Sequence, residues 1–129
     1  MHSGKQILVV DELVTTTDHV SRILKEANYT NIDCFHDAVS ALSALREKEY
    51  DLVITDTQMQ PISGLELTRL IKTDTRLQKV RIILIGSDGL DAVVSRDGAD
   101  SYVTKPFEPR GLTEKVEDVL STVAQLASG

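Results

Sequence analysis

The sequence predicts a doubly wound α/β fold, in which a five-stranded parallel sheet is covered by helices on both faces. Two observations support this prediction. Short runs rich in β-branched and aromatic residues, mostly without polar alternation, recur along the chain and are typical of buried parallel strands. Between these runs, apolar residues recur with the spacing of one helix face, and regular strand–helix alternation implies right-handed crossovers between parallel strands.

The individual elements follow from these two patterns. The predicted strands are 6–10, 32–35, 51–55, 81–85 and 101–103. The predicted helix faces are Val20, Ile23, Leu24 and Ala27; Ala38, Ala41, Leu42 and Leu45; Leu67, Leu70 and Ile71; and Leu112, Val116, Val119, Leu120 and Val123. Thr16 or Thr17 is expected to cap the first helix, and 90–97 has only a faint helical pattern.

Composition limits the class of protein. A chain of 129 residues with 41% hydrophobic residues fits one domain, which we expect over 5–127 after a disordered or cloning-derived extension at 1–4. The net charge of -6 argues against direct binding of nucleic acid. Cys34 cannot form an internal disulfide and is expected to be a small buried residue. No apolar run reaches the roughly 20 residues that span a bilayer, so we expect a cytoplasmic protein without membrane contact.

Polar residues follow several predicted strands at their carboxyl ends, the edge where ligands bind in open α/β sheets. Asp11 and Glu12 follow the first strand, Asp56 the third, Ser87 the fourth and Lys105 the fifth. Each of them alone is typical of a turn, a helix cap or a solvated charge. Together, three carboxylates on one rim would repel one another unless a cation such as Mg²⁺ lay among them. A lysine on the same rim favours an anionic group, most plausibly a phosphoryl group, brought to the metal.

Three segments resemble the receiver domain of two-component response regulators, and the resemblance covers nearly the whole chain. "ILVVDE" is similar to the first strand of that family with its acidic pair, and "DLVITDTQM" to the strand that carries the phosphoacceptor. "GADSYVTKPF" is similar to the segment with the lysine and the following proline, and it is the most specific match. The resemblance implies a CheY-like fold with the flavodoxin-like strand order 2-1-3-4-5.

The resemblance also implies residue roles. Asp56 would take a phosphoryl group from a sensor histidine kinase or a histidine phosphotransfer protein, as a stoichiometric acceptor that promotes its own phosphorylation and dephosphorylation. Asp11, Glu12, Asp56 and the main-chain carbonyl of Gln58 would hold Mg²⁺. Lys105 would contact the phosphoryl group. The family also has a cis peptide bond at the position of Lys105–Pro106.

The switch region departs from the family pattern. The family usually has Thr or Ser at the end of the fourth strand, where this chain has Gly86, and Ser87 one position later is a candidate substitute for the missing hydroxyl. Tyr102 stands at the position of the family's switch aromatic, although an ordinary core or edge tyrosine is an equal alternative. The stretch from Gly86 to Lys105 is shorter than is usual in the family. The sequence therefore does not decide whether the domain signals to a partner protein or an output domain through the 90–127 face, or through a homodimer.

Two other functions remain as alternatives. A phosphorylation-independent scaffold with an atypical switch region is favoured by Gly86. An aspartate-nucleophile phosphatase would need a second acid two residues after the nucleophile, but Gln58 stands there. Hydrolysis by a Ser/His/Asp triad and metal binding by histidines have no supporting motif.

Overall fold

The computed structural model of the chain describes residues 4–87 and 98–128, with 122–128 described by backbone alone. The elements are, in order, β1 (Gln6–Val10), α1 (Val14–Glu26), β2 (Asn31–Phe35), α2 (Ala38–Glu47), β3 (Leu52–Asp56), α3 (Gly64–Thr73), β4 (Arg81–Gly86), β5 (Ser101–Thr104) and α5 (Pro109–Ser128). Every predicted strand is confirmed, with bounds that differ by no more than one residue at either end. The faint pattern at 90–97 lies outside the described residues.

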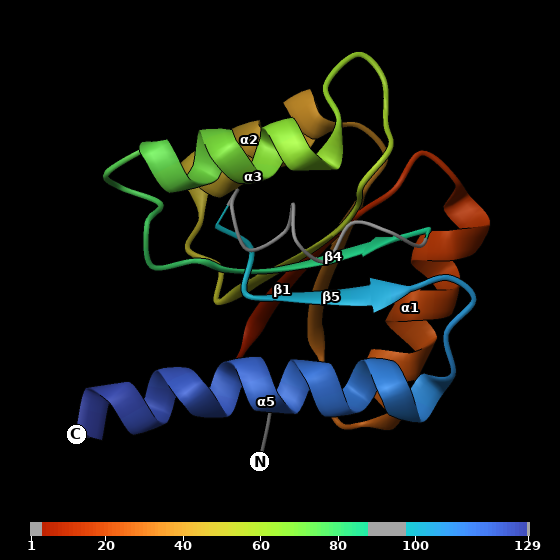
Figure 1. The fold of residues 1–129 in the computed structure, drawn as a ribbon, viewed down its shortest axis with the longest axis vertical. Helices are drawn as coiled ribbons and strands as arrows, with labels where there is room; N and C mark the ends of the chain where they lie inside the picture. The colour runs from red at the N-terminus through yellow and green to blue at the C-terminus, as the bar shows by residue number, and fades with distance from the viewer. Residues whose placement is uncertain (1–3, 88–97, 129) are drawn as a thin grey trace.

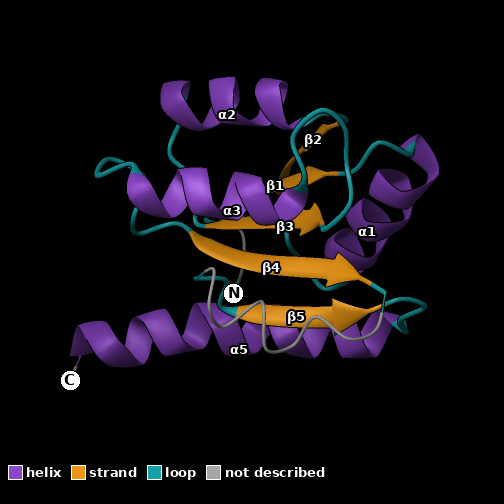
Figure 2. Ribbon diagram, turned by 45° about the horizontal axis from the view of Figure 1, so that its top comes forward, coloured by secondary structure: helices purple, strands orange, loops and turns teal. Residues whose placement is uncertain are grey.

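The sheet confirms the predicted fold class and strand order. Its order is β2-β1-β3-β4-β5, and every neighbouring pair is parallel. Because the strands are parallel, all their carboxyl ends lie at one edge of the sheet, as the arrowheads in Figure 2 show. This arrangement places the ends of β1, β3, β4 and β5 near one another, although they are far apart in sequence.

The helices form two layers around the sheet. Figure 1 shows α1 and α5 on one side and α2 and α3 on the other. In β1, Ile7 and Val9 pack into the α1/α5 core, whereas Leu8 and Val10 pack into the α2/α3 core. Both faces of the central strands are therefore buried, which explains why the sequence shows apolar runs instead of polar alternation.

The helix faces agree closely with the predicted spacing. In α2, the buried residues are Ala38, Ala41, Leu42 and Leu45, the four that were predicted. The predicted face of α5 is buried from Leu112 to Leu120, and the side chain of Val123 lies outside the described residues. Within the described ranges, no helix is both long enough and apolar enough to cross a membrane.

The prediction that all five strands are buried was wrong for the two edge strands, β2 and β5. In β5, only Val103 is buried. Every residue of β2 is only partly buried, because it is the edge strand beside β1. Cys34 is therefore half-buried, and its thiol lies 3.9 Å from the Thr17 carbonyl oxygen, which it faces as a weak donor.

The predicted cap of α1 was also wrong. The helix begins at Val14, so Thr16 and Thr17 are already in its first turn. Their backbone N–H groups both donate to the Leu13 carbonyl, and Leu13 makes no side-chain cap. The chain enters this helix through Asp11 instead, because the Leu13 N–H donates to Asp11 Oδ1 at 2.9 Å. A residue of the predicted site thus also shapes the start of α1.

Candidate functional site

Three charged side chains meet at the carboxyl edge of the sheet. Asp11 follows β1, Asp56 ends β3 and Lys105 follows β5. The Lys105 ammonium nitrogen lies 3.2 Å from Asp56 Oδ2 and 3.5 Å from Asp11 Oδ2. The structure therefore brings together an acidic pair and a single cation from three strands.

Asp11 is the most buried of these groups, with 4% of its side chain exposed. Burial raises the pKa of Asp11 above its usual range, and the charge of Asp56 raises it further, whereas the Leu13 N–H and Lys105 lower it. The net effect is that the folded protein disfavours the ionised form of Asp11. A carboxylate held in this way is a good ligand for a cation, which would offset the repulsion from Asp56.

Asp56 is fixed in position by the end of β3 and remains partly exposed. It is the last residue of β3, and 14% of its side chain is exposed. The Gln58 N–H donates to Asp56 Oδ1 at 3.3 Å. Behind it, Gly64 begins α3 so close to the strand that a Cβ on Gly64 would lie 1.8 Å from the Asp56 carbonyl oxygen. A glycine is therefore required there, and its role was missed because only the folded chain brings α3 against β3.

Glu12 follows Asp11 in the chain, but its carboxylate accepts a hydrogen bond from the loop after β3. The Gln60 N–H donates to Glu12 Oε2 at 3.0 Å. In the part of the chain that the structure describes, no three Asp, Glu, His or Cys side chains gather closely enough to form a metal site. The structure therefore assembles Asp11 and Asp56, while Glu12 and the exposed Gln58 lie at the rim of the same edge.

Two proline peptide bonds in these loops are cis. Lys105–Pro106 is cis, as the resemblance implied, and Gln60–Pro61 is cis as well, which was not expected from the sequence.

The predicted switch residues lie at the ends of β4 and β5. Gly86 ends β4, and Ser87 follows it as an exposed residue. Tyr102, in β5, donates its hydroxyl to the Ser87 carbonyl oxygen. The backbone of Gly86 is tied to the site, because its carbonyl accepts from the Lys105 N–H at 2.8 Å. The sequence did not indicate this link between the lysine loop and the end of β4.

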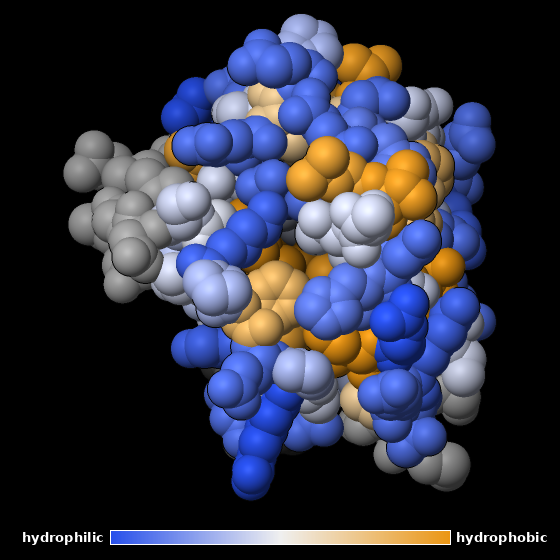
Figure 3. Space-filling model, turned by 90° about the vertical axis from the view of Figure 1, so that its right-hand side faces the viewer, coloured by the Kyte–Doolittle hydropathy of each residue, from blue (hydrophilic) through white to orange (hydrophobic). Residues whose placement is uncertain are grey.

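An apolar surface borders the charged group. Figure 3 views the carboxyl edge of the sheet, where hydrophobic residues gather among polar ones. A hollow of about 660 Å³ is lined by Leu13, Thr15, Thr16, His19, Lys105, Pro106 and Phe107. The His19 and Phe107 rings stack with centroids 5.7 Å apart. His19 is 86 residues from Lys105 along the chain, and the sequence showed no sign that they share this surface.

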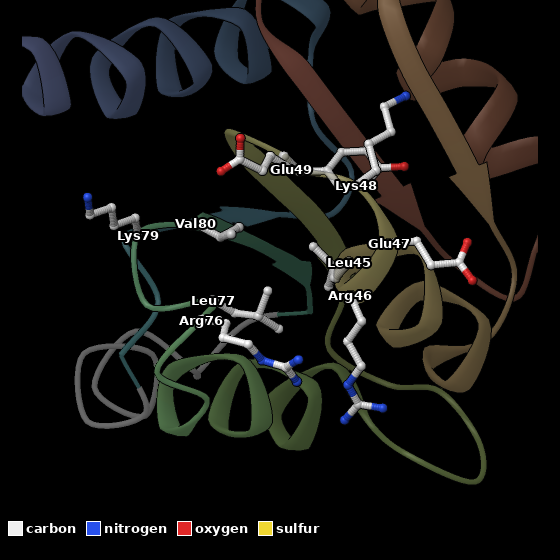
Figure 4. Close-up of a pocket in the computed structure, with 10 residues that line it drawn as sticks. Leu45, Arg46, Glu47, Lys48, Glu49, Arg76, Leu77, Lys79 and Val80 are labelled. Atoms are coloured by element: carbon white, nitrogen blue, oxygen red, sulfur yellow. The ribbon is translucent and has the colours of Figure 1, made fainter.

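A second hollow lies at the opposite, amino edge of the sheet. It has a volume of about 320 Å³ and lies between the end of α2 and the loop that leads into β4 (Figure 4). Its lining includes Arg46, Lys48, Arg76 and Lys79 together with Glu47 and Glu49. None of the predicted site residues lines it, so it is separate from the carboxyl-edge group.

Comparison with known proteins identifies the family of the chain. A model of the response regulator receiver domain matches residues 7–117. The chemotaxis protein CheY of Pseudomonas aeruginosa is 28% identical over 121 residues, which are 92% of this chain and 98% of that protein.

Solved structures give the same result. The signal receiver domain of a signal transduction histidine kinase from Syntrophus aciditrophicus is 32% identical and superposes with a TM-score of 0.83. The match covers 93% of this chain and 92% of that domain's chain. NtrX from Brucella abortus, solved in complex with ADP, is 28% identical and has a TM-score of 0.88. That match covers 99% of this chain but 29% of NtrX.

Proposed function

Because the chain belongs to the response regulator receiver domain family, we propose that it accepts a phosphoryl group on Asp56 and acts as a two-state signalling switch in the cytoplasm. The observation that carries this proposal is the position of Asp56 at the carboxyl edge of the sheet, 3.2 Å from the Lys105 ammonium and with 14% of its side chain exposed. The donor would be a phosphohistidine of a sensor histidine kinase or a phosphotransfer protein.

The reaction is a transfer to a carboxylate. The N–P bond of the phosphohistidine breaks, and a bond forms between phosphorus and a carboxylate oxygen of Asp56. The electron pair of the broken bond stays on the imidazole nitrogen, which takes up a proton. Rigid placement of Asp56 by β3 and by Gly64 favours in-line attack, and Lys105 stabilises negative charge on the phosphoryl oxygens.

The residues present fit Mg²⁺. Asp11 and Asp56 supply two converging carboxylates, and their repulsion contributes to the raised pKa of Asp11, which a cation would reverse. Glu12 and the main-chain carbonyl of Gln58 are further oxygen donors at the same edge. When bound, the ion would offset charge on the phosphoryl group during transfer.

The test is phosphorylation by a small donor. The protein is mixed with Mg²⁺ and acetyl phosphate, and its intact mass is compared with that of an Asp56→Asn variant, which keeps the shape of the side chain but lacks the nucleophile. One added phosphoryl group on the unmodified protein, absent from Asp56→Asn and absent without Mg²⁺, supports the proposal. An equal adduct on the variant contradicts it.

A second function is favoured by one observation. Gly86 leaves the end of β4 without a side-chain hydroxyl, so the domain could bind a partner without phosphorylation, through the face that includes β5 and α5. This scaffold is distinguished by beryllofluoride, which mimics a phosphoryl group. Failure of Mg²⁺ and beryllofluoride to bind, together with no phosphoryl adduct, would favour the scaffold.

A further inference from the structure

The space beside Gly86 is filled by Thr57, the residue that follows β3. A Cβ built on Gly86 would lie 2.4 Å from Thr57 Oγ1 and 2.9 Å from Thr57 Cγ2. Both distances are too short for real Cβ contacts, so the Thr57 side chain occupies the space that a side chain at position 86 would need. The end of β4 therefore has no side chain of its own, but it has a threonine hydroxyl beside it.

Backbone hydrogen bonds hold this pair at the site. The Thr57 N–H donates to the Ile85 carbonyl at 3.0 Å, and the Thr57 carbonyl accepts from the Gly64 N–H at 2.9 Å. Gly86 in turn accepts from the Lys105 N–H. Thr57 thus follows the proposed nucleophile directly, and its side chain packs against the residue that anchors the lysine loop.

The Thr57 hydroxyl is available for a ligand. Thr57 is 2% exposed, and both of its backbone groups are already bonded. Among residues 4–87 and 98–128, no protein group forms a hydrogen bond with its hydroxyl. A hydroxyl without a protein partner can donate to an anionic acceptor, and hydrogen bonds to charged groups are stronger than neutral ones.

The position of Thr57 complements that of Lys105. Side chains alternate across the sheet, so Asp56 belongs to the α1/α5 side and Thr57 to the α3 side. A phosphoryl group on Asp56 would extend past the end of the strand, where both sides meet. Lys105 would then contact it from one side, and a donor on the other side would complete its coordination.

We infer that Thr57, the residue that follows β3, supplies the hydroxyl that Gly86 leaves out of β4, and that it donates a hydrogen bond to a phosphoryl oxygen on Asp56. Gly86 and Thr57 form a complementary pair, in which the glycine makes room for the threonine. This inference rests on the proposed function, and it assigns the donor to Thr57 in preference to the exposed Ser87.

The test separates the hydroxyl of Thr57 from its packing. Binding of beryllofluoride in the presence of Mg²⁺ is measured by ¹⁹F NMR on the full chain for Thr57→Val, which keeps the shape, and for Thr57→Ser, which keeps the hydroxyl. Thr57→Val should weaken binding about tenfold, because it removes one hydrogen bond to a charged group, and Thr57→Ser should stay within about threefold. A purely structural role would not give this order.

Two further variants complete the design. In Thr57→Ala/Gly86→Ser the hydroxyl moves to β4, so binding should be stronger than in Thr57→Ala alone. Thr17→Val is the matched control, since it also removes a buried threonine hydroxyl, one that bonds the Val14 carbonyl in α1, and it should bind beryllofluoride like the unmodified protein.

The inference is overturned if Thr57→Val binds as tightly as the unmodified protein, or if Thr57→Ser loses as much as Thr57→Val. A tenfold loss in Ser87→Ala with none in Thr57→Val would assign the hydroxyl to Ser87. If the unmodified protein itself neither binds beryllofluoride nor accepts a phosphoryl group, the proposed function fails and the inference falls with it.

Discussion

The two edges of the sheet use acidic residues in opposite ways. At the amino edge, Asp100 lies 3.2 Å from Arg81 Nη1 and 3.8 Å from Lys72 Nζ, and it accepts the Ile82 N–H at 2.8 Å. At the carboxyl edge, Asp11 and Asp56 share one cation, Lys105. Acids at the amino edge are paired for stability, whereas those at the carboxyl edge are left partly uncompensated, as the binding of a cation would require.

A second acid at the amino edge follows the same rule. Asp51 Oδ2 accepts the Gln6 N–H at 2.8 Å, and its backbone carbonyl accepts the Arg81 N–H at 3.1 Å. Asp51 therefore links the starts of β1, β3 and β4. The comparison of the two edges indicates that a carboxylate points to a functional site when the fold provides few hydrogen-bond donors or cations to pair with it.

The largest expected effect is at the carboxyl edge. Asp56→Asn should abolish formation of the phosphoryl adduct, because the amide is not a nucleophile for phosphoryl transfer. Its free energy of unfolding should change by less than about 1 kcal/mol, since the shape is kept. Intact mass and urea denaturation check these two outcomes. A folded Asp56→Asn variant that still accepts the phosphoryl group would contradict the functional role of the carboxyl edge.

The next effect is at the amino edge. Asp100→Ala should lower the free energy of unfolding by about 2–3 kcal/mol, because it leaves the Ile82 N–H and Arg81 without their acceptor. Phosphoryl transfer to Asp56 should remain. Urea denaturation gives the stability, and acetyl phosphate labelling provides the control. A variant as stable as the unmodified protein would show that Asp100 is not a structural acid.

Removal of the charge of Asp11 should raise the free energy of unfolding, whereas removal of Asp100 should lower it. The pKa of Asp11 is raised by folding, so its ionisation costs stability as pH rises from the unfolded value of 3.8 through the folded value. Without Mg²⁺ at neutral pH, Asp11→Asn should therefore raise the free energy of unfolding.

The same variant should lose its response to the ion. Mg²⁺ should stabilise the unmodified protein and have little effect on Asp11→Asn. The gain in stability should also disappear as the pH falls well below 3.8, where Asp11 is protonated in both the folded and the unfolded chain. Thermal unfolding with and without Mg²⁺ at two pH values checks this, and a loss of stability at neutral pH would contradict the proposed repulsion.

The smallest effect is expected at Lys72. Burial lowers the pKa of Lys72, while Asp100 raises it, so desolvation opposes the ion pair. Lys72→Met keeps the apolar stem but loses the bond to the Val80 carbonyl, and stability should change by less than about 1 kcal/mol. Chemical denaturation beside Asp100→Ala measures the difference. A loss as large as that of Asp100→Ala would show that the lysine, rather than the carboxylate, organises this edge.

The repeating elements and the group of residues at one edge of the sheet could be predicted from the amino-acid sequence. Strand runs and the helix face of α2 depend on neighbours a few residues apart, so their periodicity can be read directly. Asp11, Asp56 and Lys105 could be grouped because parallel strands place all their carboxyl ends together.

Contacts between residues that are distant in sequence could not be predicted and are seen only in the folded chain. The sheet order makes β2 an edge strand. The turn at Asp11 lets α1 begin before Thr16, and the loop after β3 donates a hydrogen bond to the Glu12 carboxylate. The pairing of Thr57 with Gly86 is the clearest case. Such contacts depend on register and on free space between strands, which local periodicity does not encode.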